Sequence, residues 1–198
     1  MFISVEAEKE NLFSLIQKLI QIRSYSGDEK EIVEFIVSKM KEFGFDEAYH
    51  DAFGNAIGRI GNGQIKIMFD AHIDTVKVTE TETWAHPPFG GEIVNGKMYG
   101  RGVVDEKPAM AGFMIAGKVL KQIYGDNFPF TLYVVGSVLE EDADGYPLYH
   151  IIANEGIKPD YVVLGEPTDL KVYRGQRGRM EVKITATGKS AHGAHNQK

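Results

Sequence analysis

Short apolar runs alternate along this chain with longer segments of helical periodicity, and this alternation restricts the fold more than any other feature. Three runs, at residues 65–69, 131–139 and 161–164, are rich in β-branched and aromatic residues and have the length of strands. Two of the three are continuous rather than alternating, as expected for strands covered on both faces. Strands that alternate with helices predict an α/β domain with a largely parallel central sheet.

Four helices are expected between and around these runs. The first carries an apolar stripe, the second is opened by the capping box Ser26-x-x-Glu29, and the third follows Pro108, which suits a first helical turn. The stretch 75–100 has little periodicity and includes the hairpin-turn signal Asn95-Gly96. An alternating run at 180–187 predicts a further strand. The helical segments are the stripe Leu12, Leu15, Ile16 and Leu19, the segment from Ser26 to Gly44, the segment after Pro108, and roughly residues 147–155.

Acidic side chains follow each of the three apolar runs directly. Residues 70–74 read Asp-Ala-His-Ile-Asp, residues 140–142 read Glu-Glu-Asp, and Glu166 comes two positions after the third run. Asp105 ends a glycine-flexed loop that reads GRGVVD. Because ligands and catalytic groups in open α/β sheets gather beyond the carboxyl ends of the strands, we expect these groups to share one pocket.

One histidine, His72, and several carboxylates in a chain without cysteine form a ligand set suited to Zn²⁺, Co²⁺ or Mn²⁺. Asp74, two positions further on, can accept the other N–H of the imidazole. Glu140 and Glu141 are adjacent, so in an extended chain they point to opposite sides, and one can hold a metal while the other faces the attacking water. The pattern indicates metal-assisted hydrolysis. Each signal alone also has a structural interpretation, such as a surface His-x-Asp pair or a solvated acidic turn.

Composition excludes several other classes of function. The formal net charge of -6 argues against binding to nucleic acid through phosphate neutralisation. The first residues are acidic where a signal peptide needs a basic patch, and no apolar stretch approaches the roughly 18 residues that a membrane helix requires. We therefore expect a cytoplasmic protein that has neither nucleic acid nor a membrane as a partner.

At these motifs the sequence resembles the co-catalytic zinc metallopeptidase family that contains acetylornithine deacetylase, succinyl-diaminopimelate desuccinylase, aminoacylase and glutamate carboxypeptidase. The string YRGQRGRMEV, at 173–182, is similar to a branch of deacetylases and dipeptidases. The resemblance implies a zinc-exopeptidase-like αβα sandwich with a mostly parallel, mixed sheet over residues 1–175. It also implies the start of an inserted α+β lid domain at 176–198. The matching text is FDAHIDTV (69–76), W-x-x-PPFGG-x-I-x-NGKMYGRG-x-x-D (84–105), VLEED (138–142) and VVLGEPT (162–168).

The resemblance further implies a site for two Zn²⁺ ions, with Co²⁺ and Mn²⁺ as alternatives. In this family pattern Asp105 bridges both metals, and the peptide bond after it is cis. His72 and Glu166 complete the protein ligands of the first metal, and Glu141 binds the second. The family's last ligand, a histidine to the second metal, lies in a C-terminal section beyond Lys198.

Other roles follow from the same resemblance. Glu140 is the expected general base, Asp74 supports the metal-binding histidine, and His192 matches a lid histidine that reaches the partner subunit's active site in a homodimer. Apart from the resemblance, Arg177 or Arg179 is a candidate to pair with a substrate carboxylate, and the alternative is that both are exposed charges at the hinge of the lid. The implied substrates are small peptides or N-acyl amino acids. Two alternatives stay open, a truncated and inactive metal-binding fragment of such an enzyme and a phosphoesterase with another dinuclear centre.

Overall fold

The computed structural model describes residues 5–175, 177–180 and 182–188. The chain divides into two compact units, Met1–Pro167 and Thr168–Lys198. Every helix and strand assigned to the described residues belongs to the first unit. That unit therefore carries the fold, and the assignment of 176–198 to a lid domain stays a prediction.

A five-stranded mixed sheet forms the centre of the first unit, in the order β1-β2-β6-β3-β7. The β1, β2 and β6 neighbours are antiparallel, whereas β3 runs parallel to both β6 and β7. The sequence predicted the three strands on the parallel side and missed the β1–β2 hairpin, whose strands are short. The strands are β1 (Glu47–His50), β2 (Ala56–Ile60), β3 (Lys66–His72), β6 (Thr131–Ser137) and β7 (Tyr161–Leu164).

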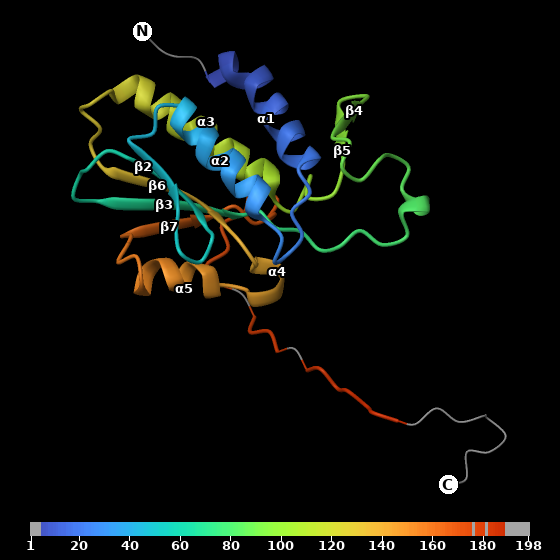
Figure 1. Cartoon of the computed structure of the whole chain (residues 1–198). Helices are drawn as coiled ribbons and strands as arrows, with labels where there is room; N and C mark the ends of the chain where they lie inside the picture. The colour runs from blue at the N-terminus through green and yellow to red at the C-terminus, as the bar shows by residue number, and fades with distance from the viewer. Residues whose placement is uncertain (1–4, 176, 181, 189–198) are drawn as a thin grey trace, which may run out of the picture. The chain divides into compact units, whose positions relative to one another are not determined.

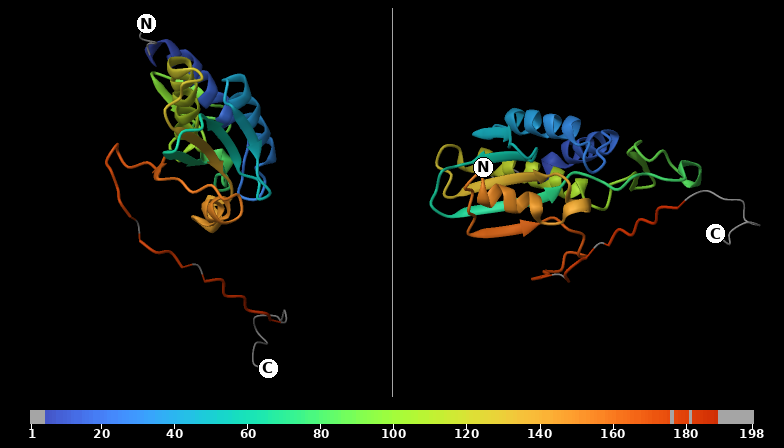
Figure 2. Two further views of the ribbon diagram at one scale, coloured as in Figure 1. Left: turned by 90° about the vertical axis from the view of Figure 1, so that its left-hand side faces the viewer. Right: turned by 60° about the horizontal axis from the view of Figure 1, so that its bottom comes forward.

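Helices cover both faces of this sheet, which confirms the predicted αβα sandwich. Figures 1 and 2 show the long helices on one face and a shorter helix on the other. The long helices bury their apolar stripes in the larger core, while Ile151 and Leu148 of the short helix pack against Ile57, Met68 and Val135. The helices are α1 (Lys9–Gln21), α2 (Lys30–Glu42) and α3 (Lys107–Tyr124) on the first face and α5 (Tyr146–Ala153) on the second.

Smaller elements complete the first unit. Asn95 and Gly96 turn the expected hairpin with φ values of 51° and 75°, the positive values that a tight two-residue hairpin turn requires. Pro108 lies in the first turn of α3, as its missing N–H allows. The remaining elements are the 3₁₀ turns η1 (Val5–Glu8) and η2 (Thr81–Thr83), the hairpin strands β4 (Glu92–Val94) and β5 (Lys97–Tyr99), and the short helix α4 (Glu140–Ala143).

The parallel register brings the carboxyl ends of three strands side by side at one end of the sheet. His72 at the end of β3 pairs with Ser137 at the end of β6, and Asp70 pairs with Leu164 at the end of β7. The chain segments that follow these strands therefore start next to one another. These segments contain most of the acidic residues that the sequence analysis selected.

Two expectations about strands were wrong. Residues 161–164 are a continuous apolar run, yet all of β7 is exposed, because it lies at the edge of the described sheet with β3 as its neighbour. Met180 and residues 182–187 are assigned to no strand. A strand is stable only with a partner to accept its ladder hydrogen bonds.

Among the described residues, no helix combines the length and the apolar character that crossing a membrane requires.

Candidate metal centre

His72 lies at the centre of the candidate site. It is the last residue of β3 and is 2% exposed. Its Nε2 is 2.8 Å from Oδ1 of Asp105, and its Nδ1 is 3.1 Å from the main-chain oxygen of Asp74 and 3.5 Å from Oδ1 of the same residue. One ring nitrogen therefore faces Asp74, which leaves the other directed at the carboxylates of the site.

Four carboxylates gather around this imidazole in two groups. In one group the ligand atoms of His72, Asp105 and Glu141 lie within 4.8 Å of one another, and in the other those of His72, Glu140 and Glu166 do so. The structure thus brings together every residue predicted to bind metal or to act as the base. The grouping differs from the family pattern, which places Glu166 with His72 and Asp105.

Mutual repulsion and burial dominate the electrostatics of this cluster. Partial burial raises the pKa values of Glu140, Glu141 and Glu166, and nearby carboxylates add to the rise. Burial alone would lower the pKa of His72, but hydrogen bonds to Asp105 and Asp74 outweigh it and raise the pKa to about 11. The imidazolium proton thus neutralises part of the negative charge.

Two further acids are buried at the same end of the sheet. Burial raises the pKa of Asp70 to about 7, and burial followed by repulsion from Glu166 raises the pKa of Glu106 to about 8. One carboxyl oxygen of each, Oδ1 of Asp70 and Oε2 of Glu106, is buried without a hydrogen-bond partner. Excess negative charge with unsatisfied oxygens is the environment that a divalent cation stabilises. The donor set, one imidazole and several carboxylates, suits Zn²⁺, Co²⁺ or Mn²⁺.

The loop after Asp105 is anchored on both sides. The Asp105–Glu106 peptide bond is cis, as the family pattern implies. Glu106 accepts the main-chain N–H of His72 at 2.7 Å, and the fully buried ammonium of Lys107 donates to the main-chain oxygens of Leu19 and Ile22 near the end of α1. Burial lowers the pKa of Lys107 to about 7. The loop that carries Asp105 is therefore tied to both β3 and α1.

Asp74 contacts more of the site than the sequence indicated. Its carboxylate is fully buried and accepts the main-chain N–H groups of Glu140 and Glu141 at 3.0 and 3.2 Å, and the hydroxyl of Ser26 at 2.7 Å. Asp74 thus fixes the imidazole and the two glutamates together.

The expectation that Glu140 and Glu141 lie in an extended chain was wrong. Both belong to the first turn of α4, because Leu139 adopts φ 60° and ψ 22° and turns the chain out of the sheet. Both side chains still reach the histidine, one in each ligand group.

The prediction of a capping box at the start of α2 was also wrong. Glu29 is itself the N-cap residue of α2 and makes no side-chain capping bond. The Ser26 hydroxyl instead donates to the Asp74 carboxylate. The Glu29 carboxylate accepts the main-chain N–H groups of Gly27 and Leu139.

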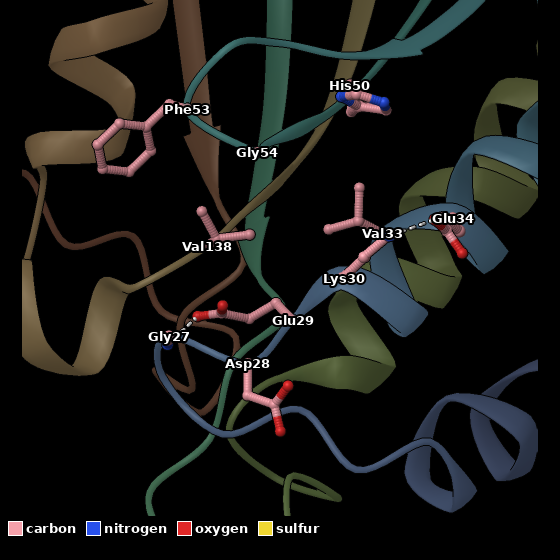
Figure 3. A pocket seen from close by; sticks show the side chains of 10 residues that line it. All are labelled: Gly27, Asp28, Glu29, Lys30, Val33, Glu34, His50, Phe53, Gly54 and Val138. Atoms are coloured by element: carbon pink, nitrogen blue, oxygen red, sulfur yellow. Dashed lines mark hydrogen bonds and ion pairs between the residues drawn. The ribbon is translucent and has the colours of Figure 1, made fainter.

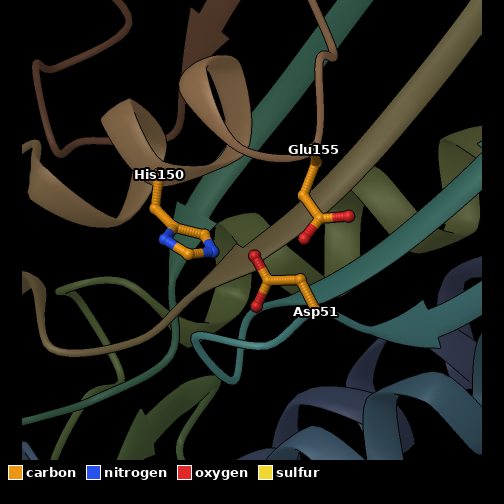
Figure 4. A group of neighbouring side chains, drawn as sticks. All are labelled: Asp51, His150 and Glu155. Atoms are coloured by element: carbon orange, nitrogen blue, oxygen red, sulfur yellow. The ribbon is translucent and has the colours of Figure 1, made fainter.

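A separate group of potential ligands, Asp51, His150 and Glu155, lies between the β1–β2 turn and α5 (Figure 4). Oδ1 of Asp51 already accepts three main-chain N–H groups, and its Oδ2 accepts the side-chain amide of Asn55. This carboxylate therefore shapes the turn and is less available to a cation than those around His72.

Three predicted site residues are not placed at the centre. His192 lies outside the described residues. Arg177 and Arg179 belong to the second unit and are exposed, so their pairing with a substrate carboxylate stays a prediction.

Sequence reasoning missed several residues that organise the centre: Ser26 and Glu29, whose bonds it misassigned, and Asn55, Glu106 and Lys107. Apart from Ser26, which donates to the Asp74 carboxylate, they bond to main-chain atoms, so neither spacing nor periodicity marks them. The adjacency of Glu106 and Lys107 to Asp105 is the one signal that was available.

Fold and site together define an α/β domain built around a candidate metal centre at the carboxyl ends of parallel strands. Residues 68–194 match the family described as peptidase family M20/M25/M40. The chain belongs to this family.

Named relatives agree with this assignment. The chain is 42% identical over 179 residues to the uncharacterized protein YgeY of Escherichia coli (strain K12). The aligned region covers 90% of this chain and 44% of that protein. It is 30% identical over 206 residues to the succinyl-diaminopimelate desuccinylase of Orientia tsutsugamushi (strain Ikeda), covering 94% of this chain and 51% of the relative. The chain thus spans about half the length of these relatives.

A solved structure shows the same fold. Human carnosine dipeptidase 1 superimposes with a TM-score of 0.69 at 15% identity, covering 81% of this chain and 39% of that one.

Proposed function

We propose that this chain carries the metal centre of a hydrolase that cleaves amide or peptide bonds in small substrates. The observation that carries the proposal is the convergence of Asp105, Glu140, Glu141 and Glu166 on His72. The names of the desuccinylase and dipeptidase relatives support small peptides or N-acyl amino acids as the substrate class.

In this proposal His72, Asp105, Glu141 and Glu166 would hold two divalent cations, zinc by preference, with Asp105 as the ligand that the family pattern assigns to both. When bound, the cations supply Lewis acidity that polarises the scissile carbonyl and acidifies water. Asp74 holds the imidazole in the orientation that directs its other nitrogen at the cation.

Glu140 is the proposed general base. It takes a proton from the attacking water and returns it to the leaving amine. Burial and neighbouring carboxylates raise the pKa of this side chain, which makes it a stronger base than an ordinary glutamate. The geometry alone places both Glu140 and Glu141 in ligand groups, so their division of labour rests on the family resemblance.

The whole protein is further proposed to be a homodimer in which the lid histidine His192 reaches the active site of the partner subunit, and the family resemblance supports this proposal. A cytoplasmic location is proposed from the composition, and the pairing of Arg177 or Arg179 with a substrate carboxylate from the chemistry of the guanidinium group.

The test is metal analysis combined with hydrolysis assays on the zinc-loaded protein. N-acetyl amino acids and dipeptides should be hydrolysed, whereas a phosphate ester should not. Glu140→Gln should lower turnover by roughly 10³-fold with the metal content unchanged, while Glu141→Gln should lose metal. The exposed neighbour Asp142 supplies the matched control, Asp142→Asn, which should change neither quantity.

The outcomes separate the alternatives. Metal loss in Glu140→Gln with retention in Glu141→Gln would exchange the two roles. Metal retention without any hydrolysis by the unsubstituted chain would restrict it to metal binding, and hydrolysis of the phosphate ester alone would replace the amidase proposal.

A further inference from the structure

Four consecutive main-chain N–H groups, from Val138 to Glu141, each donate to a side chain far away in the sequence. The N–H of Val138 bonds to Oδ1 of Asn55 and that of Leu139 to Oε1 of Glu29, both at 3.1 Å. The next two N–H groups bond to the two carboxylate oxygens of Asp74. We call Glu29, Asn55 and Asp74 the acceptor set.

The acceptor set is needed because β6 ends at Ser137 and the chain then leaves the sheet. Beyond that point no ladder partner satisfies the N–H groups, and Leu139 takes the left-handed conformation that a bulky residue rarely adopts. Such a conformation persists only where the surroundings determine it. Side-chain oxygens from three other segments provide those surroundings.

Glu29 reaches the turn from the start of α2. It is 8% exposed, and the oxygen that accepts the N–H of Leu139 also accepts that of Gly27 at 2.8 Å. Figure 3 shows its carboxylate directed toward Gly27 and lying near Val138, at the wall of a pocket of about 350 Å³. The segment predicted to cap α2 thus supports the turn that carries the proposed base.

Asn55 is fully buried and is itself held by Asp51. Its side-chain NH₂ donates to Oδ2 of Asp51 at 2.8 Å, which directs its oxygen at Val138. The sharply turned segment 51–55 therefore supplies one precisely oriented acceptor.

We propose that Glu29 and Asn55 are positioning residues, which fix the main chain at Val138 and Leu139 and thereby set where Glu140 and Glu141 present their carboxylates. This inference rests on the proposed metal centre. Replacing either acceptor by an apolar side chain leaves a buried N–H without a partner, so the turn must shift to regain one. A shift there moves a cation ligand and the base together.

The test is a Co²⁺ titration of the full chain, followed by visible absorption, which reports both affinity and coordination geometry. Glu29→Leu removes the acceptor and should weaken Co²⁺ binding by about 10- to 100-fold and change the absorption band. Glu29→Gln keeps an acceptor oxygen at the same place and should restore both. The matched control is Glu31→Leu on the exposed side of α2, which should leave both unchanged.

Circular dichroism shows whether each variant is folded. If Glu29→Leu does not fold, Glu29→Asp carries the test, because it keeps a carboxylate but withdraws the accepting oxygen from the N–H of Leu139 by one methylene group, and its absorption band should change. Unchanged affinity and band in the folded variant would refute the positioning role. Failure of the unsubstituted chain to bind Co²⁺ would instead refute the metal centre, and the positioning role with it.

Discussion

At the scale of single residues, the candidate centre brings together carboxylates whose negative charges repel one another. Asp70 and Glu106 are buried with one unpartnered oxygen each, and the positive charge of the His72 imidazolium partly offsets the rise of their pKa values. Such an arrangement holds protons tightly when no metal is bound. The free energy of unfolding of the metal-free protein must then depend on pH, in a direction that the pKa shifts define.

The first prediction concerns the metal-free protein. The folded-state pKa values of Asp70 and Glu106, about 7 and about 8, lie above their unfolded values near 4, so the folded state binds more protons between these limits. Their contribution to stability is complete below pH 4 and is lost as the pH rises through 7 and 8. His72 acts in the same direction, since its contribution is complete below about 6.5 and is lost near 11. Lys107 acts in the opposite direction above pH 7, because its lowered pKa of about 7 means that the unfolded state binds more protons there. The free energy of unfolding should therefore fall between pH 5 and pH 8 and level off toward pH 9.

Urea unfolding of chelator-treated protein across this pH range measures the effect. Asp70→Asn removes one titrating group and should flatten the profile by about 3 kcal/mol between pH 5 and pH 9. Saturating Zn²⁺ should also flatten it, because a bound cation replaces the protons. A metal-free profile that rises with pH would contradict the assignment of charges.

The ligand candidates at the centre were predictable because each chemically distinctive residue follows an apolar run. His72, Glu140 and Glu166 could be selected in this way. The residues that hold them could not, since Glu29 and Asn55 act on main-chain N–H groups, and any residue type can supply such a group. The sequence also gave no reason for Leu139 to adopt a left-handed conformation, which only the tertiary structure imposes.

At the scale of elements, α3 lies closely against the sheet and its neighbouring segments. A Cβ added to Gly117 would come within 2.6 Å of the Phe45 ring and 3.2 Å of Ile60, both of which are buried. A Cβ added to Gly112, on the same helix, would meet nothing within 4 Å. Close packing against Phe45 therefore requires a glycine at position 117, whereas packing leaves room for a larger residue at position 112.

The second prediction uses this pair. Gly112→Ala should stabilise the protein by about 0.5–1 kcal/mol, because alanine is the better helix former. Gly117→Ala gains the same propensity but overpacks the core, and should be net destabilising by about 1–2 kcal/mol. Chemical denaturation of the two variants beside the parent checks both signs. Equal stabilisation by both would show that α3 can move away from Phe45.

Prediction from sequence worked well for the elements with strong local signals and failed where pairing decides the outcome. The helices and the parallel strands have long stripes or continuous apolar runs. The β1 and β2 segments are short, and their pairing in a hairpin joined by residues 51–55 is a tertiary decision. The same reason explains why residues 180 and 182–187 are not a strand in spite of their alternation.

At the scale of the whole molecule, the centre and both cores belong to the unit Met1–Pro167. The third prediction is that a chain ending at Pro167 folds and binds Co²⁺ as the full chain does. Its melting temperature should stay within about 4 °C of the parent, the shift that roughly 1 kcal/mol produces in a domain of this size. Differential scanning calorimetry and Co²⁺ titration measure the two quantities.

Loss of cation affinity on this truncation would show that residues after Pro167 contribute to the centre. Retention of affinity would show that the later residues are not needed for cation binding.

The parallel register of β3, β6 and β7 also bears on how the protein acquires its metal during folding. The potential ligands come from positions 72, 105, 140, 141 and 166, and they meet only when strands distant in the chain have paired. Such non-local pairing is slow to form, and no local segment of the chain contains a pre-assembled ligand set. For the proposed metal centre we therefore predict that a cation binds late in folding and then, by mass action, makes unfolding rarer.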